Sequence, residues 1–566
     1  MRGTTRPRPV LKQQARISVM DRRNFLKLCS ATLLSGAGLA CEEGASTAGA
    51  GRPLPSVGPG PSLPGPLPVS PGEWGVPPVG SEHSLLPAEN TPEAMLEIFL
   101  LGGMSAWETF YTVPQFCDPS IGGDYSGQQW WMFQGEGRSV ESWFGECDGG
   151  TRPLYEPFAA DAAGVTVNLG PFIYPLRDRP DILSRMRVWV VSHDVEPHAV
   201  AIPFAVAGHN VSNPRMAGLG THLQRFFGEQ AGVGGAPSAY SIFMSSFNRS
   251  NNGAAATALG LHPATAQPLA MQLGPNPSLP ERLPRPGVAG HKTELDALVD
   301  HYTQQLRQRL DHAIAGGLRA PAYNDFEAVR RAMGNHEALV DLLPASLFEL
   351  PDVTMCTSHP GYPQSAEIFT VTDETTASLE MARHMITAGK DAPRYVQVME
   401  GGVFTDPTGQ GYDTHAEHVY GQGPNLMHLS RRLASIINEP GENDPAKLDL
   451  DRHFVLLNTE FGRAPVPEVT PANPGARGTN HWPWGYVVVG FGGFADEERS
   501  GVVGAIGEDG RAISSVTPTE HRAAMLLAMG VWPFSDESFA VGDVRGAGSE
   551  LEAALKLRAE ILGYPV

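Results

Sequence analysis

Short apolar runs alternate with longer amphipathic segments along most of the chain after residue 90. Four runs are continuous and rich in β-branched or aromatic residues, the pattern of strands buried on both faces of a parallel sheet. They are MRVWVVSH (186–193), RYVQVMEGG (394–402), RHFVLLNTEFG (452–462) and GYVVVGFGG (485–493). Helical periodicity lies between and beyond them, over 293–316, 323–342, 376–389, 424–438, 518–530 and 549–562. This alternation predicts an α/β sandwich with a mainly parallel central sheet.

Composition divides the rest of the chain. Residues 42–90 are dominated by Pro and Gly and show no apolar period, which predicts a linker without a packed core. A single folded domain is expected over 91–566, and its order begins near the apolar run EAMLEIFLLGG. Within this domain, residues 225–350 carry few strand signals and predict an insertion of helices and loops.

Residues 1–41 have the features of an export signal. In DRRNFLKLCSATLLSGAGLAC, Arg22 and Arg23 precede a modest apolar stretch, which is the order of a twin-arginine signal. The stretch is too short and too rich in Gly and Ser to cross a membrane as a stable helix. Cys41 ends the stretch and predicts either a lipid-modified Cys that tethers the protein to a membrane or an ordinary cleavage nearby. The sequence therefore predicts recognition by the twin-arginine machinery and a periplasmic or envelope location.

Of the five Cys, three lie beyond the signal. Cys117 and Cys147 share one loop-rich region, and in an oxidising compartment they could form a disulfide. Cys356 would then be left over as a buried, inert thiol. No C-x-x-C pair exists, which argues against a thiolate zinc site.

The chain is acidic, with 41 Lys and Arg against 61 Asp and Glu and a formal net charge of −20. Nucleic-acid binding needs Lys and Arg to replace counterions, so the composition argues against that function. An acidic balance is compatible with carboxylates gathered around cations.

Polar side chains follow the predicted strands. Because ligands bind at the carboxyl ends of strands in open α/β sheets, these positions are candidates for a site. Five strand-flanking segments contribute Ser105, Glu108 and Thr109; His193 and His198; Asp413, His415 and His418; Glu460 and Arg463; and His481.

Several motifs occur in a fixed order in the C-terminal half: GYDTH, LLNTEFGRAP, GTNHWPWGYVVVGFGGF, VVGAIGEDG and VTPTEHRAAMLLAMGV. With the N-terminal FLLGGMSAWETF, they resemble the exported domain-of-unknown-function 1501 family. The resemblance covers roughly residues 94–535 and is tight in 409–531. That family is grouped with the alkaline phosphatase and sulfatase superfamily, so the resemblance implies a three-layer sandwich and a metal-site region.

The resemblance also implies roles for individual residues. Asp413 and His415 match a loop that gives an Asp and a His to a metal, with His418 as an alternate. Glu460-Phe461-Gly462 stands where an Asp-His-Gly loop is usual, and His481 matches the last metal-binding His. Gly102 occupies the place of an Asp ligand at the end of the first strand, and Glu108 is the nearest substitute. A mixed set of imidazoles and carboxylates suits Zn, Mn or Fe, whereas carboxylates alone suit Mg or Ca.

Each remaining candidate has two interpretations. Ser105 and Thr109 are the nearest hydroxyls for a nucleophile, although Ser105 also suits a helix N-cap. His193 and His198 are either metal ligands or loop histidines satisfied by the backbone. Arg463 either supports the substrate or forms a structural ion pair with Glu460. His418 lies one helical turn beyond His415 and otherwise faces solvent.

Two functions follow from these residues. The first is an exported metal-dependent hydrolase of phosphate or sulfate esters. The second is a non-catalytic relative that binds a glycan, a partner or the envelope. A formylglycine sulfatase is disfavoured, because CDPSI has Ile121 where the required Cys-x-Pro-x-Arg has Arg.

Overall fold

The computed structural model of the protein describes most of the region predicted to fold. The described residues are 74–116, 153, 155–211, 213, 217–230, 240–244, 269–272, 297–298, 301–302, 304–305, 345–348, 351–356, 368–389, 392–403, 411–415, 418–468, 478–535 and 538–565. The predicted export signal with Cys41, the proposed Cys117–Cys147 pair and the predicted helix at 323–342 lie outside them.

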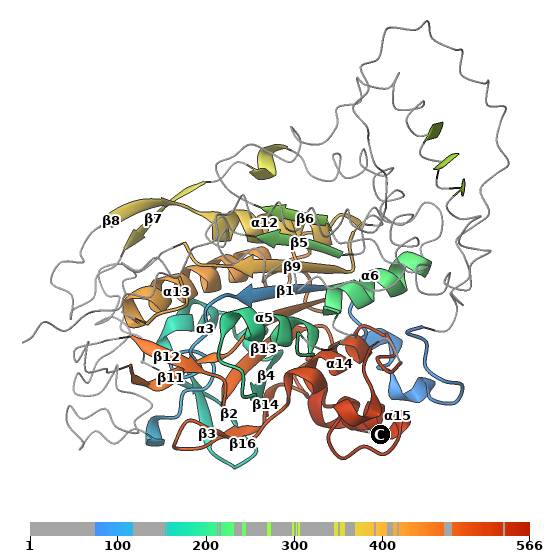
Figure 1. The fold of residues 1–566 in the computed structure, drawn as a ribbon. Coiled ribbons are helices and arrows are strands. Elements are labelled where there is room, and N and C mark those ends of the chain that lie inside the picture. The colour runs from blue at the N-terminus through green and yellow to red at the C-terminus, as the bar shows by residue number, and fades with distance from the viewer. Residues whose placement is uncertain are drawn as a thin grey trace, which may run out of the picture. The chain divides into compact units, whose positions relative to one another are not determined.

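The largest sheet has eight strands and is mostly parallel (Figure 1). Only β13 runs antiparallel to both of its neighbours, β4 and β10, and every other pair in this sheet is parallel. The strand order is β14 (Gly501–Val503), β4 (Met186–Val191), β13 (Tyr486–Gly492), β10 (His453–Thr459), β1 (Ala94–Leu100), β9 (Tyr395–Glu400), β5 (Tyr240–Met244) and β6 (Leu269–Gln272). The predicted α/β class and mainly parallel sheet are therefore confirmed, as are the four predicted strands.

Strand β1 shows why the sheet needs helices on both faces. All seven of its residues are buried. Leu96 and Ile98 point into one hydrophobic core, whereas Met95 and Phe99 point into the other. The exception is Glu97, whose carboxylate forms an ion pair with the buried Arg522 guanidinium.

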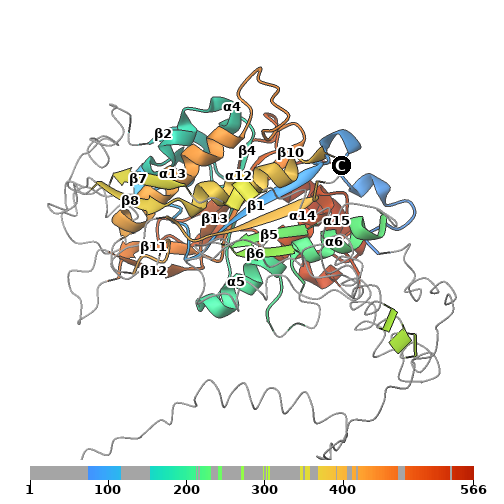
Figure 2. The same ribbon diagram turned by 90° about the horizontal axis from the view of Figure 1, so that it is seen from above.

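Helices cover both faces of the sheet, as Figure 2 shows from above. One core includes residues of α3 (Tyr174–Arg177), α4 (Pro180–Leu183), α12 (Glu374–Ile386) and α13 (His418–Ile436). The other includes residues of α5 (His198–Ala207), α6 (Leu219–Gln230), α14 (Pro518–Ala528) and α15 (Glu550–Lys556). A capping box between Thr517 and Glu520 begins α14 at Pro518, where the predicted helical period 518–530 also starts. Helix α13 begins six residues before the predicted 424, with Pro424 inside it.

Smaller elements complete the described fold. Two-stranded sheets pair β2 (Glu156–Ala160) with β3 (Thr166–Leu169), β7 (Asp352–Cys356) with β8 (Ile368–Thr372), β11 (Gly462–Pro467) with β12 (Thr479–Trp482), and β15 (Ala505–Ile506) with β16 (Ala512–Ser514). Short 3-10 helices span Glu82–Ser84, Ala88–Asn90, Pro114–Phe116, Pro171–Ile173, Ala345–Phe348 and Val541–Asp543, and a π-helix continues α15 over Leu557–Ile561. Among the described residues, no helix has both the length and the apolarity needed to cross a membrane.

The structure corrects the predicted insertion at 225–350. Strands β5 and β6 lie inside this stretch and extend the main sheet beyond β9. The sequence did not indicate them, because each has only four or five residues and no clear period.

The predicted linker at 42–90 is also too long at its C-terminal end. The Trp74 side chain is buried, stacks on the His222 ring with centroids 5.4 Å apart, and donates from Nε1 to Ser535 Oγ at 3.2 Å. The backbone of Gly75 accepts a hydrogen bond from the Trp532 amide. Within the described residues, packing therefore already includes Trp74, whose large aromatic ring buries apolar area inside a stretch that the composition predicts as a linker.

Candidate metal centre

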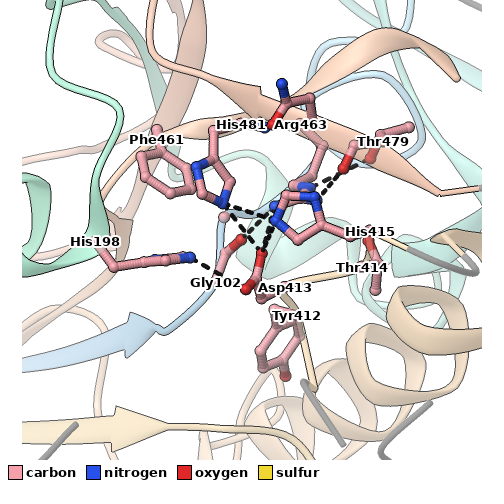
Figure 3. Close-up of polar contacts among 12 residues, drawn as sticks. Gly102, His198, Tyr412, Asp413, Thr414, His415, Phe461, Arg463, Thr479 and His481 are labelled. Carbon is pink, nitrogen blue, oxygen red and sulfur yellow. Dashed lines mark hydrogen bonds and ion pairs between the residues drawn. The ribbon is translucent and has the colours of Figure 1, made fainter. Parts of the chain in front are cut away.

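The candidate residues gather at the carboxyl edge of the main sheet. Strands β1, β4, β9 and β10 run in the same direction, so the loops that follow them meet at this edge. His198 begins α5 after β4, Asp413 follows β9, and Glu460 directly follows β10. His481 lies on β12, which pairs with β11 just beyond β10. Figure 3 shows the imidazoles of His198, His415 and His481 pointing toward Asp413.

Asp413 is the centre of this group. Its Oδ1 lies 2.8 Å from Arg463 Nη1, 3.0 Å from His415 Nε2 and 3.2 Å from His481 Nε2. Its Oδ2 lies 3.1 Å from His198 Nε2. One carboxylate therefore faces three imidazole nitrogens, which come from three separate segments of the chain.

Three of these residues have donor atoms close enough to hold a metal ion. Ligand atoms of His198, Asp413 and His481 all lie within 4.8 Å of one another. His198 Nε2 is buried and has no partner with hydrogen-bond geometry, although Asp413 Oδ2 is 3.1 Å away. His415 Nε2 and His481 Nε2 lie 3.0 Å apart, close to the roughly 3.3 Å between donors of a tetrahedral ion with bonds of about 2.0–2.1 Å. The residues present therefore fit a divalent ion.

The Asp413 carboxylate dominates the electrostatics of the group, and it affects the three histidines differently. Burial disfavours protonated His198, but the carboxylates of Asp413 and Glu460 outweigh it and raise its pKa to about 10. Burial also opposes ionisation of Asp413, yet its close contacts with the three histidines and the charge of Arg463 hold its pKa well below the ordinary value. The pKa of His415 is raised, chiefly by its hydrogen bond with Asp413, and that of His481 is lowered by burial.

Two further carboxylates lie behind the histidines. Glu460 Oε1 is 2.8 Å from His198 Nδ1 and accepts a hydrogen bond of 2.8 Å from the Gly102 amide. Glu468 Oε2 is 2.6 Å from His415 Nδ1. Glu460, which the resemblance implies as a ligand, thus contacts the ring nitrogen of His198 that faces away from Asp413. Glu468 was missed, because no motif marks it and its partner is 53 positions away.

The places of two ligands expected from the superfamily are filled by other groups. Gly102 has φ +117°, and a Cβ on it would lie 2.3 Å from the Asp413 amide nitrogen. Phe461 stacks on the His481 ring with centroids 4.3 Å apart and contacts the His198 ring at 5.0 Å. An aspartate has no room at Gly102, and Phe461 packs against two imidazoles instead of adding a third donor.

Ser105, Glu108, Thr109 and His418 form a separate buried network. The Ser105 hydroxyl donates to Glu108, whose Oε2 is also 3.2 Å from His418 Nε2. The Thr109 hydroxyl donates to the Ser105 carbonyl. All four side chains are buried, and His418 Nδ1 lies 2.9 Å from Thr414 Oγ1. The predicted solvent-facing position of His418 is therefore wrong. His418 begins α13, and its side chain is buried against Thr414 and Glu108. The Glu108 carboxylate bonds to Ser105 and His418, so in the described structure Glu108 belongs to this buried network.

His193 forms hydrogen bonds with the backbone, and Arg463 forms them with the backbone and with Asp413. His193 Nε2 lies 2.7 Å from the Glu460 carbonyl oxygen, and its Nδ1 accepts from the Val195 amide at 3.1 Å. Arg463 is fully buried and donates to Asp413 and to the Gly102 carbonyl. The suggested ion pair of Arg463 with Glu460 is corrected, because the guanidinium pairs with Asp413.

In chelator-treated protein, we expect the free energy of unfolding to fall as pH rises from about 6.5 to about 10. The folded-state pKa of His198 is raised from 6.5 to about 10, so its stabilising charge is complete below the first value and is lost through the second. Chemical denaturation across this range measures the slope, and His198→Gln should reduce it. Equal slopes for the two proteins would contradict this assignment.

One family is recognised in this chain. The sequence model described as "Protein of unknown function (DUF1501)" matches residues 188–534, more than half of the chain. The matched range contains His198, Asp413, His415, Glu460 and His481, whereas β1 precedes it. A comparison with curated proteins found no similar sequence. The chain that builds this cluster of three histidines and one aspartate belongs to the DUF1501 family of proteins of unknown function.

Proposed function

We propose that this protein binds one divalent metal ion at His198, Asp413 and His481 and hydrolyses an ester there. The observation that carries the proposal is the convergence of three imidazole nitrogens on one carboxylate, with donor atoms of three residues within 4.8 Å of one another. His198 Nε2 is buried and has no partner with hydrogen-bond geometry. Buried polar atoms are normally satisfied, and a bound metal ion would satisfy this nitrogen.

The donor set favours a transition metal. Imidazole suits Zn, Mn or Fe better than Mg or Ca, which prefer oxygen donors. Gly102 and Phe461 stand where two more ligands would be needed, so the proposal is for one ion. Asp413 supplies the negative charge, and Arg463 holds its Oδ1 in place.

Ester hydrolysis is supported by access and by the chemistry of such an ion. The side chains of His198, Asp413 and His481 are 27%, 18% and 15% exposed, so the group is partly open to solvent although the His198 Nε2 atom itself is buried. A bound divalent ion would polarise a phosphoryl or sulfuryl oxygen and lower the pKa of a water. Ser105 and Thr109 are fully buried and hydrogen-bonded, which favours attack by water over attack by either hydroxyl. The resemblance to the alkaline phosphatase and sulfatase superfamily supports a phosphate or sulfate ester as the substrate.

A non-catalytic relative is the second candidate. It is favoured by the same buried hydroxyls and by the absence of room at Gly102 for a second-metal ligand. In that case the protein would keep the ion for stability and bind a glycan, a partner or an envelope component.

Metal binding is tested on the purified full chain. After chelation and dialysis, wild-type protein should take up about one Zn²⁺ or Mn²⁺ per chain, and its melting temperature should rise because the ion binds only the folded state. His481→Ala should lose both effects, whereas the exposed His83→Ala should keep both. Wild-type protein that takes up no ion, or two, would exclude the single-ion site.

Activity separates the two candidates. A panel of phosphate monoesters, phosphate diesters and sulfate esters should give metal-dependent turnover if the protein is a hydrolase. Ser105→Ala should retain that turnover, because water and not this hydroxyl attacks. A metal-loaded protein that turns over no ester in the panel would favour the non-catalytic candidate.

Export is proposed from the first 41 residues. Arg22→Lys with Arg23→Lys should leave the protein in the cytoplasm, because the export receptor reads the arginine pair. Cell fractionation measures this, and unchanged envelope location would refute it. Cys41→Ala should release the exported protein from membranes if a lipid on Cys41 tethers it. Continued membrane partitioning of that variant would exclude the lipid tether.

A further inference from the structure

We propose that the metal centre has four donors, His198, His415, His481 and Asp413, and that Glu460 and Glu468 are positioning residues for the first two. This inference rests on the proposed metal binding and extends it to the carboxylates behind the rings. In metal sites, an imidazole ligand commonly donates its other N–H to a carboxylate, which sets the tautomer and the orientation of the ring.

The His198–Glu460 pair has this arrangement. His198 directs Nε2 at Asp413 and Nδ1 at Glu460 Oε1, 2.8 Å away. The Glu460 side chain is completely buried, and the same oxygen accepts a hydrogen bond from the Gly102 amide. A carboxylate has no proton to donate, so His198 must donate from Nδ1. A metal ion would replace the Nε2 proton, and the Nε2 lone pair of the neutral ring would then face that ion.

The His415–Glu468 pair repeats the arrangement. His415 directs Nε2 at Asp413 and His481, with both distances 3.0 Å, and directs Nδ1 at Glu468 Oε2, 2.6 Å away. Two imidazole nitrogens so close need either a proton or a metal ion between them, because two lone pairs repel each other. Glu468 requires the Nδ1 proton, so Nε2 of neutral His415 is the free donor.

The backbone holds Glu468 where this contact needs it. Glu468 follows β11, and its amide donates to the Gly478 carbonyl at 2.8 Å, which ties it to the start of β12. The next residue on β12, Thr479, donates from its amide to the Thr414 carbonyl at 2.9 Å. The strand pair that presents His481 therefore also fixes Glu468 relative to His415.

Whether His415 binds the ion decides how many coordination positions the protein fills. His415 lies outside the three-residue set within 4.8 Å, so its ring must turn slightly inward to reach an ion held by His198. Asp413 lies between them, with Oδ2 toward His198 and Oδ1 toward His415. Four protein donors would fill the coordination of a tetrahedral Zn²⁺ and leave no place for the water of the proposed hydrolysis, whereas a six-coordinate ion such as Mn²⁺ would keep two positions for water and substrate.

The experiment is a double-mutant cycle read by Co²⁺ affinity and by its visible absorption. Glu468→Ala should weaken Co²⁺ binding by about 10–100-fold and should shift the spectrum toward that of His415→Ala. In the His415→Ala background, Glu468→Ala should have no further effect. Glu468→Gln, which keeps an acceptor for Nδ1–H, should restore most of the affinity. Glu460→Gln should likewise keep most of the Co²⁺ affinity, because it retains an acceptor for His198 Nδ1–H.

The control is Glu442→Ala, because Glu442 is as exposed as Glu468 and forms an ordinary surface pair with Lys447. Its Co²⁺ affinity should equal that of the wild type. If the wild type binds Co²⁺ and Glu468→Ala binds it with the same affinity, this inference is overturned and the proposed function stays intact. Equal losses in the wild-type and His415→Ala backgrounds would also overturn it. A wild type that binds no Co²⁺ would overturn the proposed function itself.

Discussion

Asp413→Ala is expected to abolish metal binding and to destabilise even the metal-free protein by about 3–5 kcal/mol, as loss of one partner of a buried ion pair does. The Arg463 guanidinium is fully buried, and Asp413 is the carboxylate that pairs with it at 2.8 Å. Without Asp413, a positive charge stays inside the protein together with three crowded imidazoles. Chemical denaturation in the presence of a chelator measures the stability term, and metal analysis measures the binding term.

A cycle with Arg463 separates charge from packing. Asp413→Leu combined with Arg463→Leu should be less destabilising than the two single changes added together, because the double variant leaves neither charge buried alone. Asp413→Leu and the double variant should not bind metal tightly if Asp413 is the carboxylate donor. Additive losses of stability would show that the pair is energetically independent.

Gly102→Ala is expected to cost about 3–5 kcal/mol, from an unfavourable backbone conformation and from overpacking together. The backbone of Gly102 has φ +117°, and the added Cβ would meet the Asp413 amide nitrogen at 2.3 Å. To relieve this contact, the segment that carries Asp413 must move, so metal affinity should fall with stability. Thermal unfolding and metal titration measure the two effects.

Gly441→Ala is the matched control for Gly102→Ala. Gly441 also has positive φ, +83°, but no atom lies within 4 Å of the Cβ position. Its cost should be limited to the backbone term of about 1–2 kcal/mol, with metal binding unchanged. Gly102→Asp should not create a second metal site, because the aspartate side chain would meet the same Asp413 backbone as the alanine of Gly102→Ala. Equal stability of the Ala variants at 102 and 441 would contradict the close approach.

Much of the fold followed from the order of residues along the chain. Continuous apolar runs predicted β4, β9, β10 and β13, because strands buried on both faces leave no polar alternation. The pair Thr517 and Glu520 marked the start of α14 through a local capping box. Such features depend on neighbours within a few positions, which a single sequence displays directly.

The sequence also directed attention to the carboxyl edge of the sheet. The rule that ligands bind at strand carboxyl ends singled out Asp413, His415 and His481, and the structure brings these three side chains together. The rule does not say, however, which of the candidate side chains belong to the same site. It also named Ser105, Glu108 and His418 as candidates, whereas their side chains bond to one another in the interior.

Tertiary structure alone decided the details on which the chemistry depends. Glu460 turned out to lie behind His198, and Glu468, which no motif marks, behind His415. Gly102 is a point of backbone contact with Asp413, and Trp74 anchors a segment whose composition predicts a linker. The sequence by itself determined β4, β9, β10 and β13, the cap of α14 and the types of donor, because these depend on local periodicity and side-chain chemistry. Which donors face one another was decided by long-range packing, since contacts such as that between Glu468 and His415 join residues whose spacing along the chain carries no period.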